Sequence, residues 1–343
     1  MSRAQLTSTV EQNTGGAVGP FVAGKNKIIN GDFGIWQRGT SFALSSNAVY
    51  GPDRFLCDSG SLNYTFSRQA FTAGTAPVAG YEGQYFIRAA ATSGSGGYPK
   101  IYQKIEDVRT LAGQTVTLSF WIKASASTTG PNFQLIQYFG TGGSPSATWY
   151  STIQGISVTT SWQRVSYTVT LPSLAGSTLG TNNDACLQAI LNIPNSGTLS
   201  IDTWGWQLEA GSVATPFTTA TGTVQGELMA CQRYYFRLTA DATRVYSLFG
   251  SGSAGNTTGV NITLQAPVPM RVPPTSVEFS TLALSDGATV SAVNAGMTLS
   301  AALSNNIIIG ITPGVTSGLT QYRPYSLNSN NSANGYVGFS AEL

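Results

Sequence analysis

The sequence contains no histidine. Ser-His-Asp and Cys-His nucleophilic systems, and zinc sites with a histidine ligand, all need an imidazole and are therefore excluded. Cysteine is scarce as well, because Cys57, Cys186 and Cys231 are the only three residues of this type and lie far apart in the chain. An odd number at such spacing predicts buried, reduced thiols instead of a disulfide framework or a metal site.

Charge is the next thing that the sequence has little of. Only 9% of the 343 residues are Asp, Glu, Lys or Arg, against about a quarter in an average globular protein. The formal net charge is +2 and the basic residues are scattered singly, so no stripe predicts binding to nucleic acid.

Long hydrophobic runs are missing too. No stretch of about 18 apolar residues predicts a membrane-spanning helix, and the first residues lack the apolar core of a signal peptide. We therefore expect no membrane insertion, and assembly in the cytoplasm of the cell that makes the protein.

What the chain does contain is apolar residues and turn formers. Hydrophobic residues make up 41% of the sequence, which is enough to fold despite the low charge. The length predicts two or three domains. Short runs of alternating or β-branched residues separated by Gly, Asn and Ser are typical of an antiparallel sandwich, and the clearest are residues 115–122, 161–171 and 198–208.

Composition divides the chain into four segments. Residues 1–24 are rich in Ser, Thr, Gln and Gly and predict an N-terminal attachment arm. Residues 25–220 carry the first sandwich, residues 221–239 a connecting helix, and residues 240–343 a second β-rich domain.

The helix is predicted over 224–238. Val224, Leu228, Cys231 and Tyr235 recur at spacings of four, three and four, and Thr223 can cap the first turn. Two interpretations of this stripe stay open. It fits a short parallel coiled coil between subunits, and it fits a helix that rests on its own sandwich.

The second β-rich domain has five candidate strands, at residues 259–264, 276–284, 289–299, 306–311 and 336–341. The segment 266–274 holds four prolines. Since proline lacks a backbone donor, this segment predicts an extended connection or an edge, not a central strand.

Several motifs in a fixed order carry a resemblance to known proteins. The stretch from Asn26 to Phe33, followed by Trp36 and Gly39, resembles the opening strand of jelly-roll carbohydrate-binding modules. Residues 118–124, 161–165 and 199–202 look like the central strand, the strand after it and the closing strand of such modules.

The longer pattern resembles bacteriophage tail-fibre and related particle proteins. It adds residues 51–55, 207–211, 214–217 and 231–235, then 266–271 and the ending 335–343. The resemblance implies an all-β fold: a jelly-roll β-sandwich, a short helix and a C-terminal β-sandwich-like tip domain. It also implies a virion protein of a fibre, spike or baseplate, assembled as a homotrimer. The arm would contact other tail or baseplate proteins, and the jelly roll would bind a host surface glycan.

Flat aromatic rings that can stack on a sugar are the candidate binding residues. Tyr98, Trp149 and Tyr150 lie in Gly- and Ser-rich surroundings that predict loops or strand ends, and Trp121 lies on the minority face of its strand. The alternative for each of them is that the ring fills a sandwich core or a subunit interface.

In the modules that this chain resembles, a structural calcium ion often lies where the opening and closing strands meet. The resemblance places Asn30, Asp32 and Asp202 there, with oxygen ligands of the kind that calcium takes. Gly34 replaces the acid that often follows the phenylalanine of the family pattern. The alternative is that these side chains bond turns and backbone.

Two rival functions remain at this stage. The protein could be a virion connector or decoration whose aromatic rings are all packed, or a tailspike enzyme that degrades polysaccharide. Glycoside hydrolysis needs two carboxylates separated by about 5 to 10 Å. Glu106 and Asp107 are the only adjacent acids, and neighbours on a strand point to opposite faces, so the sequence predicts no enzyme.

Overall fold

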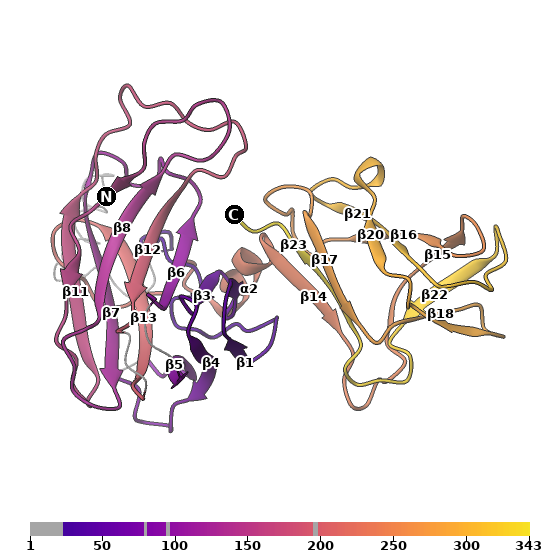
Figure 1. The fold of residues 1–343 in the computed structure, drawn as a ribbon, viewed down its shortest axis with the longest axis horizontal. Coiled ribbons are helices and arrows are strands. Elements are labelled where there is room, and N and C mark those ends of the chain that lie inside the picture. Colours follow the sequence, from indigo (N-terminus) through magenta and orange to yellow (C-terminus); the bar gives the residue numbers. More distant parts are fainter. Residues whose placement is uncertain (1–22, 79–80, 94–96, 195–197) are drawn as a thin grey trace, which may run out of the picture. The chain divides into compact units, whose positions relative to one another are not determined.

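The computed structural model describes residues 23–78, 81–93, 97–194 and 198–343 (Figure 1). Nearly all of the predicted arm, residues 1–24, lies outside these ranges. The chain forms two compact units, one of residues Met1–Leu228 with Leu343 and one of residues Met229–Glu342. The division falls inside the segment 221–239.

The N-terminal unit is a sandwich of two antiparallel sheets. The first has the order β1 (Ser41–Leu44), β4 (Asn63–Ala70), β5 (Tyr85–Ser93), β13 (Ser200–Ala210), β7 (Thr115–Ala124) and β11 (Gln163–Thr170). The second has the order β10 (Gln154–Gly155), β8 (Asn132–Tyr138), β12 (Cys186–Asn192), β6 (Lys100–Ile105), β3 (Phe55–Asp58) and β2 (Ala48–Tyr50), and β9 (Trp149–Tyr150) pairs with β8. The all-β class is confirmed, and β7, β11 and β13 are the three strands that alternation predicted.

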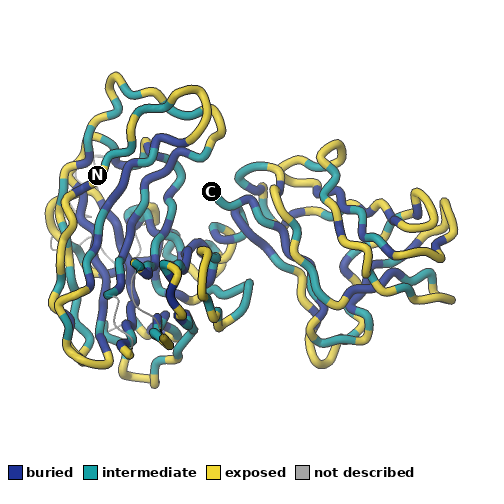
Figure 2. Tube along the Cα trace, viewed as in Figure 1, coloured by how far each residue is buried: buried dark blue, intermediate teal, exposed yellow. Residues whose placement is uncertain are grey.

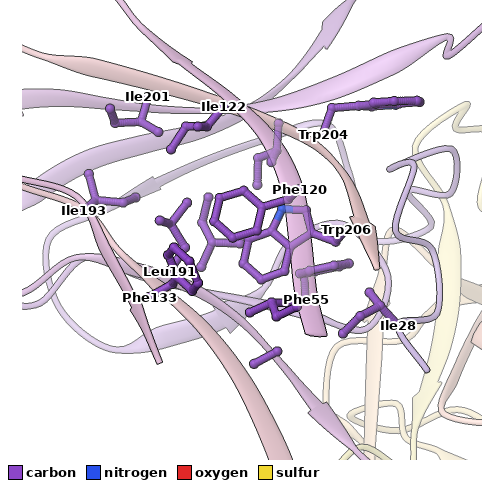
Figure 3. Close-up of a cluster of buried hydrophobic side chains, with 14 of the residues drawn as sticks. Ile28, Phe55, Phe120, Ile122, Phe133, Leu191, Ile193, Ile201, Trp204 and Trp206 are labelled. Atoms are coloured by element: carbon purple, nitrogen blue, oxygen red, sulfur yellow. The ribbon is translucent and has the colours of Figure 1, made fainter. Parts of the chain in front are cut away.

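The core between the two sheets follows from this alternation. Phe120 of β7 stacks on Trp206 of β13 with ring centroids 4.8 Å apart and meets Phe133 of β8 edge-on at 5.4 Å. Figure 3 shows Phe120, Phe133, Trp206 and Phe55 gathered in this layer. The central strands are largely buried, whereas many of the connecting loops are exposed (Figure 2). Burial of each of these aromatic side chains contributes about 1.5 to 3 kcal/mol to the stability of the fold.

A β-bulge in β13 gives the six-stranded sheet a second packed face. Trp204 pairs with Trp121 and Gln207 with Ser119, so two residues of β13 lie opposite one residue of β7. Gly205 adopts φ +68° there, and a Cβ on it would lie 2.6 Å from the ring of Trp121. The extra residue turns Trp206 into the core and Trp204 to the other side of the sheet.

The opening segment differs from its prediction. Residues 26–33 contain no strand, and residues 29–32 form turns, because Asn30 and Phe33 adopt φ values of +58° and +53° that interrupt an extended chain. The segment still lies along β13, since the Trp206 amide donates to the carbonyl of Gly31 at 2.8 Å. Asn26 is buried and donates to the carbonyls of Trp206 and Thr218, which fixes the turn against the sandwich.

The helix α2 spans Val224–Gln232 and is shorter than predicted. Thr223 caps it by accepting a bond from the amide of Gly226 at 3.0 Å. The predicted continuation to residue 238 is wrong, because Tyr235 begins the strand β14 (Tyr235–Thr239). The aromatic residues there favour a strand, and pairing with β23 decides it.

The C-terminal unit also has two antiparallel sheets. The small sheet has the order β14, β23 (Tyr336–Ser340) and β17 (Ser276–Ser280). The large sheet has the order β19 (Val290–Ala292), β18 (Ala283–Ser285), β22 (Pro324–Asn328), β15 (Leu248–Ala254), β16 (Val260–Gln265), β21 (Ile308–Pro313) and β20 (Met297–Leu299), and a short 3-10 helix covers Ala301–Leu303.

Most of the strand predictions for this unit are confirmed. Residues 276–284 and 289–299 each form two short strands instead of one, and the first break falls at Thr281, whose φ is +50°. The proline-rich segment 266–274 contains no strand, as predicted. The core is mainly aliphatic, and Ile262, Ile309 and Leu327 are fully buried in it.

Two further expectations can be compared with the structure. All three cysteines are buried thiols outside any disulfide, as predicted. Within the described ranges, no helix has the length and apolar character needed to cross a membrane.

Candidate functional site

The side of the seven-stranded sheet that faces away from the core combines tyrosines with amide side chains. In β8, Phe133 and Leu135 point into the core, so Gln134, Ile136 and Tyr138 face outward. The same alternation turns Tyr102 of β6 outward. We call this surface the outer face, and its central residues are Tyr102, Gln134, Ile136, Tyr138, Tyr150, Gln188, Ile190 and Asn192.

Strand register arranges these residues in rows. Ile190 lies opposite both Tyr102 and Gln134, which gives one row across β6, β12 and β8. In the next row, Gln188 lies opposite Ile136, and Ile136 lies opposite Tyr150. In each row a buried isoleucine, Ile190 or Ile136, separates the tyrosine ring from the amide. Neighbours in a row have the Cβ spacing of about 5 Å that an antiparallel sheet imposes.

Hydrogen bonds hold several of the amides in place. Asn192 donates to the side-chain oxygen of Asn132 at 2.9 Å, and Gln134 donates to the carbonyl of Ser151 at 2.7 Å. An anchored amide loses little freedom when it binds a ligand, so its remaining polar atom is available at low entropic cost.

One edge of the outer face is charged. Lys100 lies 3.3 Å from a carboxylate oxygen of Asp58, and its ammonium lies 5.6 Å from the ring centroid of Tyr102. Burial, with a further contribution from Asp58, raises the pKa of Tyr102 to about 12, and burial also raises the pKa of Tyr138. Both phenols are therefore protonated at neutral pH and can donate hydrogen bonds.

The structure separates the two adjacent aromatic residues that the sequence singled out. Both lie in β9, where Trp149 pairs with Gln137 and Tyr150 with Ile136. Since Gln137 points inward, Trp149 turns towards the core and is half-buried against it, whereas Tyr150 lies on the outer face and is 59% exposed. Tyr150 is therefore a surface ring and Trp149 a packing ring.

The other two predicted rings have opposite environments. Trp121 is buried, with Trp204 at 5.4 Å and the guanidinium of Arg164 at 4.6 Å from its ring. It points away from the inner core as expected, but this second packed layer covers it and leaves no free ring face for a sugar. Tyr98 is 79% exposed in the loop before β6.

The three predicted calcium ligands bond protein groups in the structure. Asn30 accepts from the amide of Ile35, and Asp32 accepts from the Tyr81 hydroxyl at 2.8 Å. Asp202 receives two bonds from Arg88, at 2.7 and 2.8 Å. No group of three or more Cys, Asp or Glu side chains suited to a metal occurs among the described residues. The calcium prediction stays a prediction, for elemental analysis to test.

Sequence reasoning missed Tyr102, Tyr138, Gln134 and Gln188. Only a partial signal was present. Residues 186–192 place Gln188 and Asn192 on one parity and three aliphatic residues on the other, but Ile190 shares the parity of the amides, and residues 132–138 carry amides on both parities. Only the pairing of β8, β12 and β6 shows which alternate residues of these strands face solvent and which face the core.

Solved structures with a similar fold belong to several kinds of protein. No family model and no curated protein matches the chain. Solved structures that resemble it include the enzymatically active domain of tailspike protein 4 of bacteriophage CBA120 (12% identity, TM-score 0.33, 55% of this chain and 22% of the tailspike). Others are the xylan-binding domain from Paenibacillus barcinonensis (12% identity, TM-score 0.30, 51% and 94%) and a cyclase from Fischerella sp. (12% identity, TM-score 0.35, 55% and 99%). The neighbours thus include a phage tailspike domain, carbohydrate-binding modules and enzymes, and at these TM-scores they assign no function.

Proposed function

We propose that the outer face of the N-terminal sandwich binds host surface glycans, and that the chain is a receptor-binding subunit of a bacteriophage fibre, spike or baseplate. The observation that supports the proposal most is the arrangement of Tyr102, Tyr138 and Tyr150 among anchored amides. Tyrosine rings stack on the apolar face of a pyranose, and amides bond its hydroxyls. The order of sequence motifs supports the particle role.

A face of this kind binds weakly in a single copy, because its polar contacts with a sugar replace contacts with water. A homotrimer would present three faces, and simultaneous binding raises the overall affinity without any new contact. The N-terminal arm would attach the subunit to other virion proteins. The proposal includes no bond-breaking step, so release of reducing ends from a host polysaccharide by the purified protein would contradict it.

The glycan part is tested by array binding and host adsorption with Tyr150→Ala and Tyr138→Ala. Loss of a central stacking ring should weaken binding at least about fivefold, equivalent to about 1 kcal/mol. Tyr322→Ala is the matched control, because Tyr322 is 80% exposed in the other unit. Unchanged adsorption by both test variants would favour a connector or decoration without sugar binding.

The particle part is tested by native mass measurement and by locating the subunit in the virion. A trimer at the tail supports the proposal. A strictly monomeric protein that is absent from any particle would contradict it, whatever the glycan result.

A further inference from the structure

A cavity of about 680 Å³ lies in the N-terminal unit, apart from the outer face of the seven-stranded sheet. Its walls come from four places in the chain: the loop around Asp32, the segment before β5, the segment after β13 and the first turn of α2. Cavities that hold small organic ligands range from about 300 to 1,000 Å³. The cavity therefore has the size of a small-molecule site.

One side of the cavity is apolar and aromatic. Ile35, Val78, Pro216 and Phe217 contribute to it, together with the ring of Tyr81. Tyr81 and Phe217 meet edge-to-face with centroids 5.3 Å apart, and Trp204 supports both, at 5.7 and 5.0 Å. The bulge in β13 places Trp204 at this position, and its packing holds the rings of Tyr81 and Phe217 in place.

The other side is acidic. Asp32 lies in the wall, where one carboxylate oxygen accepts from Tyr81 at 2.8 Å and the other has only a 3.4 Å contact to the amide of Gly34. Asp32 therefore keeps unused acceptor capacity. Glu227 is buried and already bonded to the amides of Asn30 and Thr221, and Glu82 is exposed at the rim.

No Lys or Arg lines the described part of this cavity. A cation brought into the cavity would therefore meet carboxylates that no basic side chain of the described lining neutralises.

We infer that this cavity binds a small organic cation, a protonated primary amine attached to an apolar body. The ammonium donates to Asp32, and the apolar body packs on the rings of Tyr81 and Phe217. The rings also favour a cation over their faces. This site is independent of the proposed glycan-binding face, so each can fail alone.

Isothermal titration with three probes of equal size tests the inference on the full-length protein. Benzylamine supplies the cation, benzyl alcohol the neutral analogue and benzoate the anion. Saturable binding is expected for benzylamine, with an affinity about tenfold to a hundredfold above that of benzyl alcohol, as for a charge-assisted hydrogen bond. Equal binding of benzylamine and benzyl alcohol, or none by benzylamine, would overturn the inference.

Two variants locate the site. Asp32→Asn removes the charge while its amide oxygen can still accept from Tyr81, and it should abolish the preference for benzylamine over benzyl alcohol. Val224→Trp places a large ring on a residue that lines the cavity and is 78% exposed. It should weaken the binding of benzylamine without disturbing the core. Asp241→Asn is the control for net charge, since Asp241 lies in the other unit. Unchanged binding of benzylamine to Val224→Trp would place the amine elsewhere and overturn the inference.

Discussion

The two units pack their antiparallel sheets around cores that differ in aromatic content. All six tryptophans lie in the N-terminal unit, the last at position 206. Of the close ring pairs among the described residues, only Phe236 with Phe339 belongs to the C-terminal unit. Its core also contains Phe249 and Tyr325 but is mainly aliphatic, with residues such as Ile262, Ile309 and Leu327.

The difference follows from how many faces of a sheet are covered. In the N-terminal unit, the six-stranded sheet has the core on one side and the Trp121, Trp204 and Phe217 layer on the other. In the C-terminal unit, the large sheet turns Ser251, Ser253, Asn261 and Thr263 to solvent. Large rings fill a second layer, and a solvated face needs none. The second layer also builds the walls of the cavity.

Trp206→Ala should have the largest effect on this contrast. Removing a fully buried ring that contacts Phe120 and Phe55 should destabilise the N-terminal unit by about 3 to 5 kcal/mol. Fluorescence of the remaining tryptophans reports that unit alone, and the reactivity of Cys231 reports the other. Earlier exposure of Cys231 in this variant would show that the two units unfold together.

Ile262→Ala is the corresponding change in the C-terminal unit. Ile262 is fully buried in an aliphatic core, and its truncation should cost about 2 to 4 kcal/mol. Thiol labelling of Cys231 under denaturant should shift, while the tryptophan fluorescence transition should stay in place. A loss below about 1 kcal/mol, judged from the same labelling curve, would mean that this core is loosely packed.

Gly205→Ala sharpens the comparison at the bulge. A Cβ there meets the Trp121 ring at 2.6 Å in a backbone conformation that disfavours side chains, so we expect a loss of about 1 to 3 kcal/mol. Denaturant unfolding followed by tryptophan fluorescence measures it. Gly176→Ala is the control, because Gly176 also has positive φ (+79°) but no atom within 4 Å of the position that a Cβ would take. Equal losses would assign the cost to φ alone.

Glu209→Gln should have the smallest effect and a pH signature. Burial acts to raise the pKa of Glu209, but bonds from Thr215 and Gln207 and the nearby Lys25 outweigh it, so the net pKa is lowered. Because folding lowers its pKa, the ionised Glu209 carboxylate stabilises the fold at pH values above its ordinary pKa near 4.5. This contribution is lost as the pH falls through the pKa of the folded state. The variant should cost about 1 to 2 kcal/mol at pH 7 and progressively less in acid. A pH-independent difference would contradict this account.

The strands could be predicted wherever alternation was regular, as in residues 115–122, and the capped start of α2 followed from Thr223. The end of α2 could not, because Tyr235 fits both a helical stripe and a strand, and pairing with β23 decided between them. The bulge had a signal in Gly205, a glycine inside a strand pattern. Its consequence, rings on both faces of the sheet, depended on which strand lies alongside.

The sequence indicated aromatic rings as candidate binding residues and put Trp149 and Tyr150 first among them. The structure places Tyr150 on the outer face and turns Trp149 towards the core. An aromatic side chain has the same chemistry whether it packs in a core or lies on a surface, and only the neighbouring segments decide which ring stays exposed. The sequence indicated Asp32 as a candidate site residue through the motif around Asn30. It did not indicate Tyr81 or Glu227, because they come from segments distant in the chain.

The sequence by itself determined that this is an all-β protein with buried thiols and no imidazole chemistry, because composition and local periodicity are properties of the chain. Only the tertiary structure decided that Tyr150 faces solvent while Trp149 turns inward, and that Asp32 bonds Tyr81 in the wall of a cavity. The physical reason is that facing and proximity are set by pairing between strands and segments remote in sequence, which no local pattern encodes.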